Sequence, residues 1–173
     1  DAAQMALFDM AGDRLQLFDA IGVILRRLLG RYRALAADGR VELSTTPYAH
    51  PIGPLMLDFG AARESLPDAQ LPRSAEYPGG AGRVRWHLRE AVSAHERCFG
   101  APPGGLWPAE GAVSQPFVAE VAGAGLQWSA SSESVLANSL GQAGWDQAAR
   151  RAVLYRPWCS PGGAMPLLFR DER

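Results

Sequence analysis

Acidic and aromatic side chains follow the ends of strand-like segments at three places in this sequence of 173 residues. They lie within residues 42 to 50, 107 to 110 and 169 to 171, and the acidic residues among them include Glu110 and Asp171. In parallel α/β barrels the active site forms where strands end and loops begin, so polar residues there are the first candidates for a functional role. Two carboxylates that arrive from different strand ends can divide the work, one as a nucleophile and the other as a proton donor.

Helices are predicted on both sides of these segments. Apolar residues recur at helical spacing over residues 13 to 37, with Gly30 as a candidate break, and over residues 83 to 99, where Gly100 ends the pattern. Ser114 is a suitable N-cap for a third helix over residues 117 to 122. The Pro- and Gly-rich residues 54 to 82 predict a long surface excursion.

Strand-like segments alternate with the helices. They cover residues 40 to 45, 105 to 108, 126 to 130, 152 to 158 and 165 to 169. Strands that alternate with helices imply right-handed crossovers and a parallel sheet, so the predicted fold class is α/β.

Three stretches resemble the signatures of glycoside hydrolase family 57, and they occur in that family's order. Residues 42 to 55 read ELSTTPYAHPIGPL and are similar to the second signature; residues 105 to 114 read GLWPAEGAVS and are similar to the third. Residues 154 to 158, LYRPW, followed by residues 169 to 171, FRD, resemble the approach to the fourth. The family's first signature, His-Gln-Pro, is not in this sequence.

The resemblance implies part of an incomplete (β/α)7 barrel and a retaining enzyme that cleaves or transfers α-1,4-linked glucans. Glu110 would be the nucleophile and Asp171 the acid/base, with their carboxyl groups about 5 to 5.5 Å apart on neighbouring strands. The acid must keep its proton near neutral pH, which burial or a neighbouring carboxylate favours. Arg170 would oppose this, but adjacent strand residues alternate faces, so its side chain is expected to point away.

Three further residues are candidates for substrate binding. His50 lies on a Pro-bounded loop and can donate to a sugar hydroxyl or pack within the loop. Trp107 can present an aromatic face to a pyranose or belong to the core. Glu42 can bond sugar or hold the surroundings of the nucleophile. Glu133 is left out of the candidate site, because relatives commonly show Thr-Asp-Glu where this sequence has Ser-Ser-Glu.

No residue cluster predicts a metal site or a cofactor. His87 and His95 lie eight residues apart on one predicted helix, too far for a shared metal, and are expected to be structural. Cys98 and Cys159 form no C-x-x-C pair and are expected to be buried, reduced thiols.

Composition indicates a globular segment of ordinary polarity, with 47% apolar and 20% charged residues. The net charge of -1, with arginines scattered along the chain, gives no reason to expect nucleic acid or an anionic membrane as a partner. Neither a membrane span nor a signal peptide is visible, so a cytoplasmic location is expected by default. Both ends look cut, which predicts that residues 1 to 173 form one segment of a larger barrel, of undetermined oligomeric state.

Other functions remain open at this point. Hydrolysis and transfer use the same glycosyl-enzyme, so the motifs do not separate them. A metal-dependent polysaccharide deacetylase on a similar barrel would need paired Asp and an H-x-x-x-H group, which the sequence lacks. A carbohydrate-binding relative without catalysis, or a truncated reading frame, is the remaining alternative, and the presence of both carboxylates argues against simple loss of catalysis.

Overall fold

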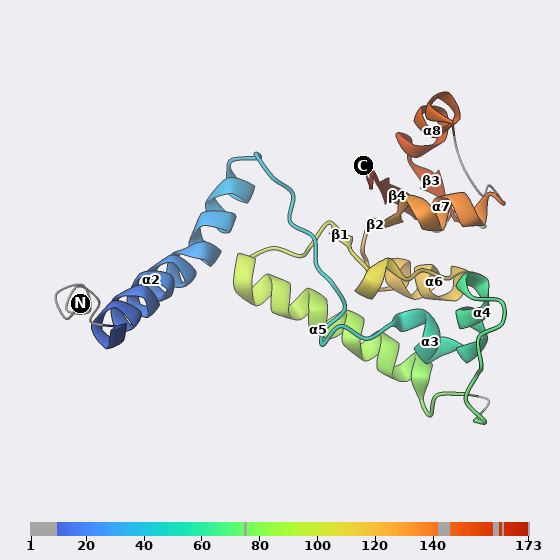
Figure 1. Ribbon diagram of the computed structural model, residues 1–173, viewed down its shortest axis with the longest axis horizontal. Helices are drawn as coiled ribbons and strands as arrows, with labels where there is room; N and C mark the ends of the chain where they lie inside the picture. Colours follow the sequence, from blue (N-terminus) through green and yellow to red (C-terminus); the bar gives the residue numbers. More distant parts are fainter. Residues whose placement is uncertain (1–9, 75, 142–145, 161–162, 164, 173) are drawn as a thin grey trace, which may run out of the picture.

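A computed structural model describes residues 10–74, 76–141, 146–160, 163 and 165–172 as a mixed α/β structure (Figure 1). Its helices and strands follow one another along the chain as α2 (Met10–Ala37), α3 (Gly53–Leu57), η1 (Phe59–Ala61), α4 (Ala62–Ser65), α5 (Gly80–Phe99), β1 (Gly105–Leu106), η2 (Ala109–Gly111), α6 (Gln115–Gly123), β2 (Trp128–Ser132), α7 (Glu133–Ser139), α8 (Gln147–Leu154), β3 (Trp158–Cys159) and β4 (Pro166–Arg170).

The strands form one four-stranded sheet in the order β1-β2-β4-β3. β1, β2 and β4 are parallel, as predicted, whereas β3 runs antiparallel to β4. The predicted strand over residues 40 to 45 is wrong, because only Thr45 pairs, in an isolated parallel bridge to Leu106. Pro47, which has no amide hydrogen to donate, follows two residues later and is buried. The chain therefore leaves the sheet at once and enters the loop that holds His50.

The core lies between the sheet and the helices α5 and α6. Buried residues recur along one side of α5 at three- and four-residue spacing, including Val84 and Leu88, and face Phe117 and Val121 of α6. Leu106 of β1 joins the same cluster and is fully buried. This packing fixes β1 against two helices, and with it the start of the loop that carries Glu110.

Two local signals in the sequence are confirmed. Ser114 caps α6, since its hydroxyl accepts a hydrogen bond from the amide of Phe117 at 3.4 Å. Gly100 ends α5 in the left-handed region, with φ of 81°.

Gly105 of β1 has no room for a side chain: a Cβ there would lie 2.1 Å from the indole of Trp128. That close approach of β1 and β2 requires glycine.

The predicted strand over residues 152 to 158 is wrong. Its first three residues, 152 to 154, belong to α8, in which Arg150 and Leu154 are buried four residues apart on one side, and only Trp158 of the segment is in a strand. The short apolar run was compatible with either structure, because periodicity does not separate a strand from a short buried helix. The strand predicted over residues 126 to 130 lies two residues later, as β2.

Both thiols are free, but neither is buried: Cys98 is partly exposed and Cys159 is exposed. The prediction of two buried cysteines is therefore wrong.

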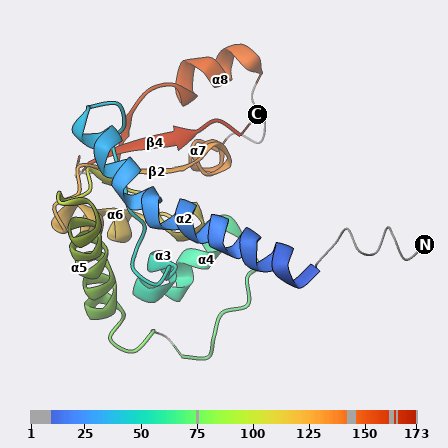
Figure 2. The same ribbon diagram turned by 90° about the vertical axis from the view of Figure 1, so that its left-hand side faces the viewer.

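Helix α2 is continuous through Gly30, so no break occurs there. It runs away from the sheet as a long arm (Figures 1 and 2), and its C-terminal half contacts α5, where Arg33 Nε donates to the carbonyl of Cys98. Its apolar side chains are exposed within this chain: Leu15, Leu17, Phe18, Ile21, Val23, Ile24, Leu25, Leu28, Leu29 and Tyr32. Even so, within the described residues no helix is both long and apolar enough for a membrane span.

Candidate active site

The carboxyl ends of the three parallel strands lie at one edge of the sheet, and an acidic residue follows each. Glu110 lies in η2 after β1, Glu133 directly follows β2, and Asp171 directly follows β4. Ser132 pairs with Arg170, so Glu133 and Asp171 leave their strands at the same level. β2 separates β1 from β4, which corrects the expectation that Glu110 and Asp171 follow neighbouring strands.

The backbone around Glu110 adopts a conformation that side chains other than glycine rarely take. Glu110 has φ of 55°, and across the site Ala49 and His50 have φ of 58° and 56°. These are the residues other than glycine with positive φ in the described parts of the chain, and all three belong to the two loops that meet here. Such outliers cost free energy and cluster at functional sites, where the surrounding structure enforces them.

His50 and Glu110 contact each other. The imidazole Nε2 lies 3.0 Å from Glu110 Oε1, and Nδ1 lies 3.5 Å from the hydroxyl of Thr46. Because an ionised carboxylate only accepts, Nε2 is the donor. Both side chains are accessible, at 53% exposure for His50 and 73% for Glu110, so the carboxylate is open to a ligand.

Helix α5 fixes the loop that carries His50. His87 Nδ1 donates to the carbonyl of Tyr48 at 2.6 Å, and the amide of Tyr48 donates to the carbonyl of His87 at 3.2 Å. His95 Nδ1 similarly donates to the carbonyl of Ala101 at 2.8 Å. Both histidines are therefore structural, as predicted.

Two buried serines of β2 fix the loop that carries Glu110. Ser131 Oγ donates to the carbonyl of Gly111 at 2.6 Å, and Ser129 Oγ donates to the carbonyl of Leu106 at 2.9 Å. Neither serine was predicted from the sequence to support the site. The available signal was a pair of hydroxyls two residues apart, on one face of a strand.

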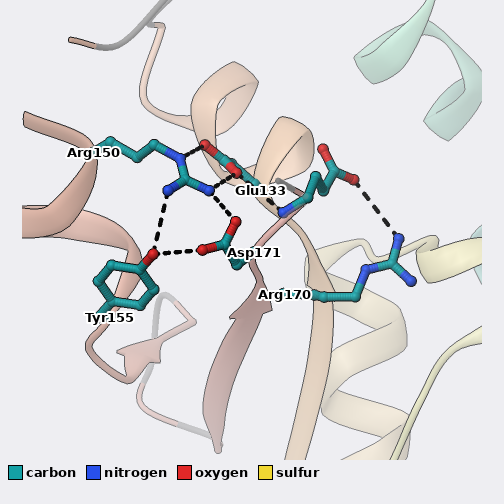
Figure 3. Close-up of polar contacts among 6 residues, drawn as sticks. Glu133, Arg150, Tyr155, Arg170 and Asp171 are labelled. Atoms are coloured by element: carbon teal, nitrogen blue, oxygen red, sulfur yellow. Dashed lines mark hydrogen bonds and ion pairs between the residues drawn. The ribbon is translucent and has the colours of Figure 1, made fainter. Parts of the chain in front are cut away.

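Asp171 lies in a group of hydrogen-bonded side chains from three segments (Figure 3). Arg150 Nη2 donates to Asp171 Oδ1, and the Tyr155 hydroxyl donates to Oδ2. The same guanidinium donates through Nε and Nη2 to the two carboxylate oxygens of Glu133, and through Nη1 to Tyr155 Oη at 3.2 Å. Arg150 is the centre of the group, and its side chain is only 6% exposed.

The electrostatics of this group favour the charged forms of Glu133 and Arg150. The hydrogen bond from Arg150 holds the pKa of the Glu133 carboxyl below its ordinary value of 4.5, against the effect of burial. The pKa of Arg150 is raised, most by its hydrogen bond to Glu133 and next by its hydrogen bond to Asp171. Glu133, which was left out of the candidate site on the sequence, thus lies directly after β2 and shares Arg150 with Asp171.

The remaining candidates lie in different places. Arg170 extends away from the Arg150 group, as predicted (Figure 3), and its guanidinium lies 5.3 Å from the centroid of the half-buried Trp107 ring. Glu42 accepts a hydrogen bond from Trp128 Nε1, beside the first residue of β2. That is the amino end of the strand, so the structure does not bring Glu42 to the other candidates.

Within the described residues, no group of three or more His, Cys, Asp or Glu side chains is arranged to hold a metal ion. The expectation that the enzyme needs no metal stays a prediction.

Parallel strands, helices packed on the sheet and acidic residues beyond the strand ends define an α/β protein with a candidate catalytic edge. The family model for glycosyl hydrolase family 57 matches residues 3–173. The chain therefore belongs to glycosyl hydrolase family 57.

Solved structures show a similar fold. An α-amylase from Thermotoga maritima matches with a TM-score of 0.58 and 17% identity, over 91% of this chain and 26% of the amylase. A family 57 branching enzyme from Pyrococcus horikoshii matches with a TM-score of 0.56 and 18% identity, over 94% and 27% of the two chains. Another, from Thermococcus kodakaraensis in complex with glucose, matches with a TM-score of 0.57 and 20% identity, over 90% and 28%.

The chain thus spans about a quarter of the length of these structures. None of the curated proteins compared with it matches.

Proposed function

We propose that the complete protein cleaves or transfers α-1,4-linked glucans with retention of the anomeric configuration. Glu110 is the nucleophile and Asp171 the acid/base. The observation that carries this proposal is the placement of both carboxylates beyond the carboxyl ends of parallel strands, at one edge of the sheet, in a chain of family 57.

The two residues divide the reaction as follows. Glu110 attacks the anomeric carbon, the bond to the leaving sugar breaks, and the leaving oxygen takes the proton of Asp171. Asp171, now ionised, then takes a proton from water or from an acceptor hydroxyl, whose oxygen attacks the anomeric carbon and releases Glu110. Water gives hydrolysis and an acceptor sugar gives transfer, so both outcomes belong to one proposal.

His50 and Trp107 assist in this proposal. His50 donates to Glu110 Oε1, which orients the nucleophile and leaves Oε2 for attack. Arg170 lies over one face of the Trp107 ring, so only the other face is available to a pyranose. The substrate is an α-glucan or maltooligosaccharide, and a cytoplasmic location remains part of the proposal.

The same proposal makes this chain one part of an incomplete (β/α)7 barrel. Three parallel strands and the bridge at Thr45 supply successive positions of such a barrel, and the similarity to the amylase and branching-enzyme structures supports it. The exposed apolar side of α2 agrees with packing against the rest of a larger protein.

The stereochemistry of the first product tests the mechanism. The complete protein is mixed with maltooligosaccharide, and the anomer released first is identified by proton NMR before mutarotation, with and without an added acceptor sugar. The α-anomer, or a longer α-linked oligosaccharide, supports the proposal. Release of the β-anomer contradicts it, because inversion needs no nucleophilic carboxylate.

A further inference from the structure

The side chains around Asp171 suggest how its orientation and its proton are controlled. Both Asp171 oxygens accept hydrogen bonds, one from Arg150 and the other from Tyr155. Arg150 belongs to α8, and Tyr155 is the residue that directly follows this helix. A proton donor must point its carboxyl at the leaving oxygen, and a single rotatable side chain at the end of a strand does not do this unaided.

Arg150 is well suited to hold that carboxyl. The guanidinium is planar and its N–H donors have fixed directions. A carboxylate that binds some of these donors therefore also fixes the direction of the others. Glu133 takes two of these donors, from Nε and Nη2, and its side chain is 15% exposed against 37% for Asp171. Glu133 thus anchors the guanidinium in the protein, while Asp171 stays accessible at its rim.

We propose that Arg150 is the positioning residue of Asp171, and that Glu133 both anchors Arg150 and balances its charge so that Asp171 can carry a proton. This inference rests on the proposed function in that it gives Asp171 the acid/base role. It assigns no contact with substrate to Arg150 or Glu133.

The charge balance follows from the number of partners. One guanidinium faces two carboxylates, so the group carries one excess negative charge when Asp171 is ionised and none when Asp171 is protonated. Without Glu133, a lone guanidinium would pair with Asp171 and oppose protonation. Without Arg150, Asp171 would lose the guanidinium charge and keep the like charge of Glu133 nearby, which favours protonation.

Tyr155 allows both states of the acid to be hydrogen-bonded. Its hydroxyl can donate to the ionised carboxylate or rotate and accept from the protonated one, whereas Arg150 only donates. Other charged and titratable groups lie around the site: Glu172, whose amide donates to Glu133 Oε2 at 3.4 Å, Arg170, which pairs with Glu172 at 3.8 Å, and Glu110 beyond β1 on the same edge.

The test compares Glu133→Gln, Arg150→Gln and Arg150→Lys in the complete protein. The basic limb of the kcat/KM profile on maltooligosaccharide should move to lower pH in Glu133→Gln and to higher pH in Arg150→Gln, each by about one unit or more. Arg150→Lys keeps the charge and should keep the limb near its original position while lowering kcat. Arg85→Gln, which breaks the exposed pair of Arg85 and Glu120, is the matched control and should move nothing.

A second readout separates misplacement of the acid from general damage. Arg150→Gln should lose at least tenfold more activity on maltooligosaccharide than on an aryl maltooligoside with a nitrophenol leaving group, which departs without a proton. Equal losses on both substrates, or basic limbs that move the same way in Glu133→Gln and Arg150→Gln, would overturn the inference.

A titration that needs no turnover keeps the inference distinct from the proposed function. The Asp171 carboxyl is followed by carbon NMR in protein labelled at aspartate, with Asp171→Asn to assign the signal. Its midpoint should move in opposite directions in Glu133→Gln and Arg150→Gln. A wild-type protein without activity on glucans would refute the proposed function, whereas an unmoved midpoint in both variants would refute this inference. Tyr155→Phe, at an exposed position, provides a third variant if Arg150→Gln does not fold.

Discussion

The two halves of the candidate site hold their carboxylates in different ways. Glu110 is placed by its backbone, which is in the left-handed region and held by the Ser131 bond to Gly111, and its exposed side chain pairs with His50. Asp171 follows a regular strand and is placed by its side-chain partners, Arg150 and Tyr155. The difference fits the two tasks: a nucleophile needs an exposed oxygen, and an acid/base needs surroundings that control its proton.

The largest effect should come from removing the charge of Glu110. Glu110→Gln keeps the volume of the side chain but removes the nucleophile, so turnover of maltooligosaccharide should fall by about 10⁴-fold or more while binding persists. Initial rates and isothermal titration calorimetry measure the two quantities. Glu120→Gln, which neutralises a carboxylate in α6, is the control and should keep its rate.

A smaller variant at the same position tests the attacking role itself. In Glu110→Gly, added azide can enter the vacated space and attack directly, which should give a product of the opposite anomeric configuration. Azide should not rescue Glu110→Gln, because the amide still fills that space. Near-normal turnover by Glu110→Gln would remove the nucleophile assignment.

Asp171 should matter less, and in a way that depends on the leaving group. Asp171→Asn should lose about 10² to 10⁴-fold on maltooligosaccharide, the usual worth of general acid–base catalysis, and clearly less on an aryl maltooligoside with a nitrophenol leaving group. Asp58→Asn, which changes the exposed aspartate at the N-terminus of η1, is the control. An equal loss on both substrates would show that Asp171 does not donate the proton to the leaving group.

The two halves also differ in how far the sequence predicted them. The segment around Glu110 and the loop at His50 were predicted because each lies within one continuous stretch that carries the family resemblance, with proline and glycine in both. The surroundings of Asp171 were missed because they depend on Arg150 in α8, a helix that the sequence did not predict and whose end overlaps the strand predicted over residues 152 to 158. Arg150 is buried and pairs with Glu133 and Asp171, which lie 17 and 21 positions away in the sequence. Local sequence patterns do not predict contacts over such separations.

A backbone variant tests whether the Glu110 half depends on its conformation. Gly111 has φ of 67°, so Gly111→Ala should destabilise the fold by about 1 to 2 kcal/mol, and the displaced Glu110 should lower turnover by about ten- to a hundredfold. Gly125 has φ of 85° with open space around it, and Gly125→Ala should cost similar stability without loss of rate. Urea denaturation and initial rates distinguish the two, and equal rates would show that the Glu110 conformation is not needed.

The smallest effect concerns stability rather than rate, and it belongs to the Asp171 half. The folded-state pKa of Glu133 lies below the ordinary value of 4.5 because Arg150 donates to it, so the ionised carboxylate stabilises the fold. That stabilisation is present above about pH 4.5 and is lost as the pH falls through the folded-state value. The difference in unfolding free energy between wild type and Glu133→Gln should therefore be largest near neutral pH and shrink on acidification, measured by urea denaturation at several pH values.

The control for this prediction is Glu120→Gln, which breaks a pair in which Arg85 is half exposed. It should differ little from wild type at any pH, because exposed ion pairs contribute little. A difference for Glu133→Gln that stays constant from neutral to acid pH would mean that the partners of Arg150 act through packing rather than charge, and the Asp171 half would then resemble the Glu110 half more than its contacts indicate.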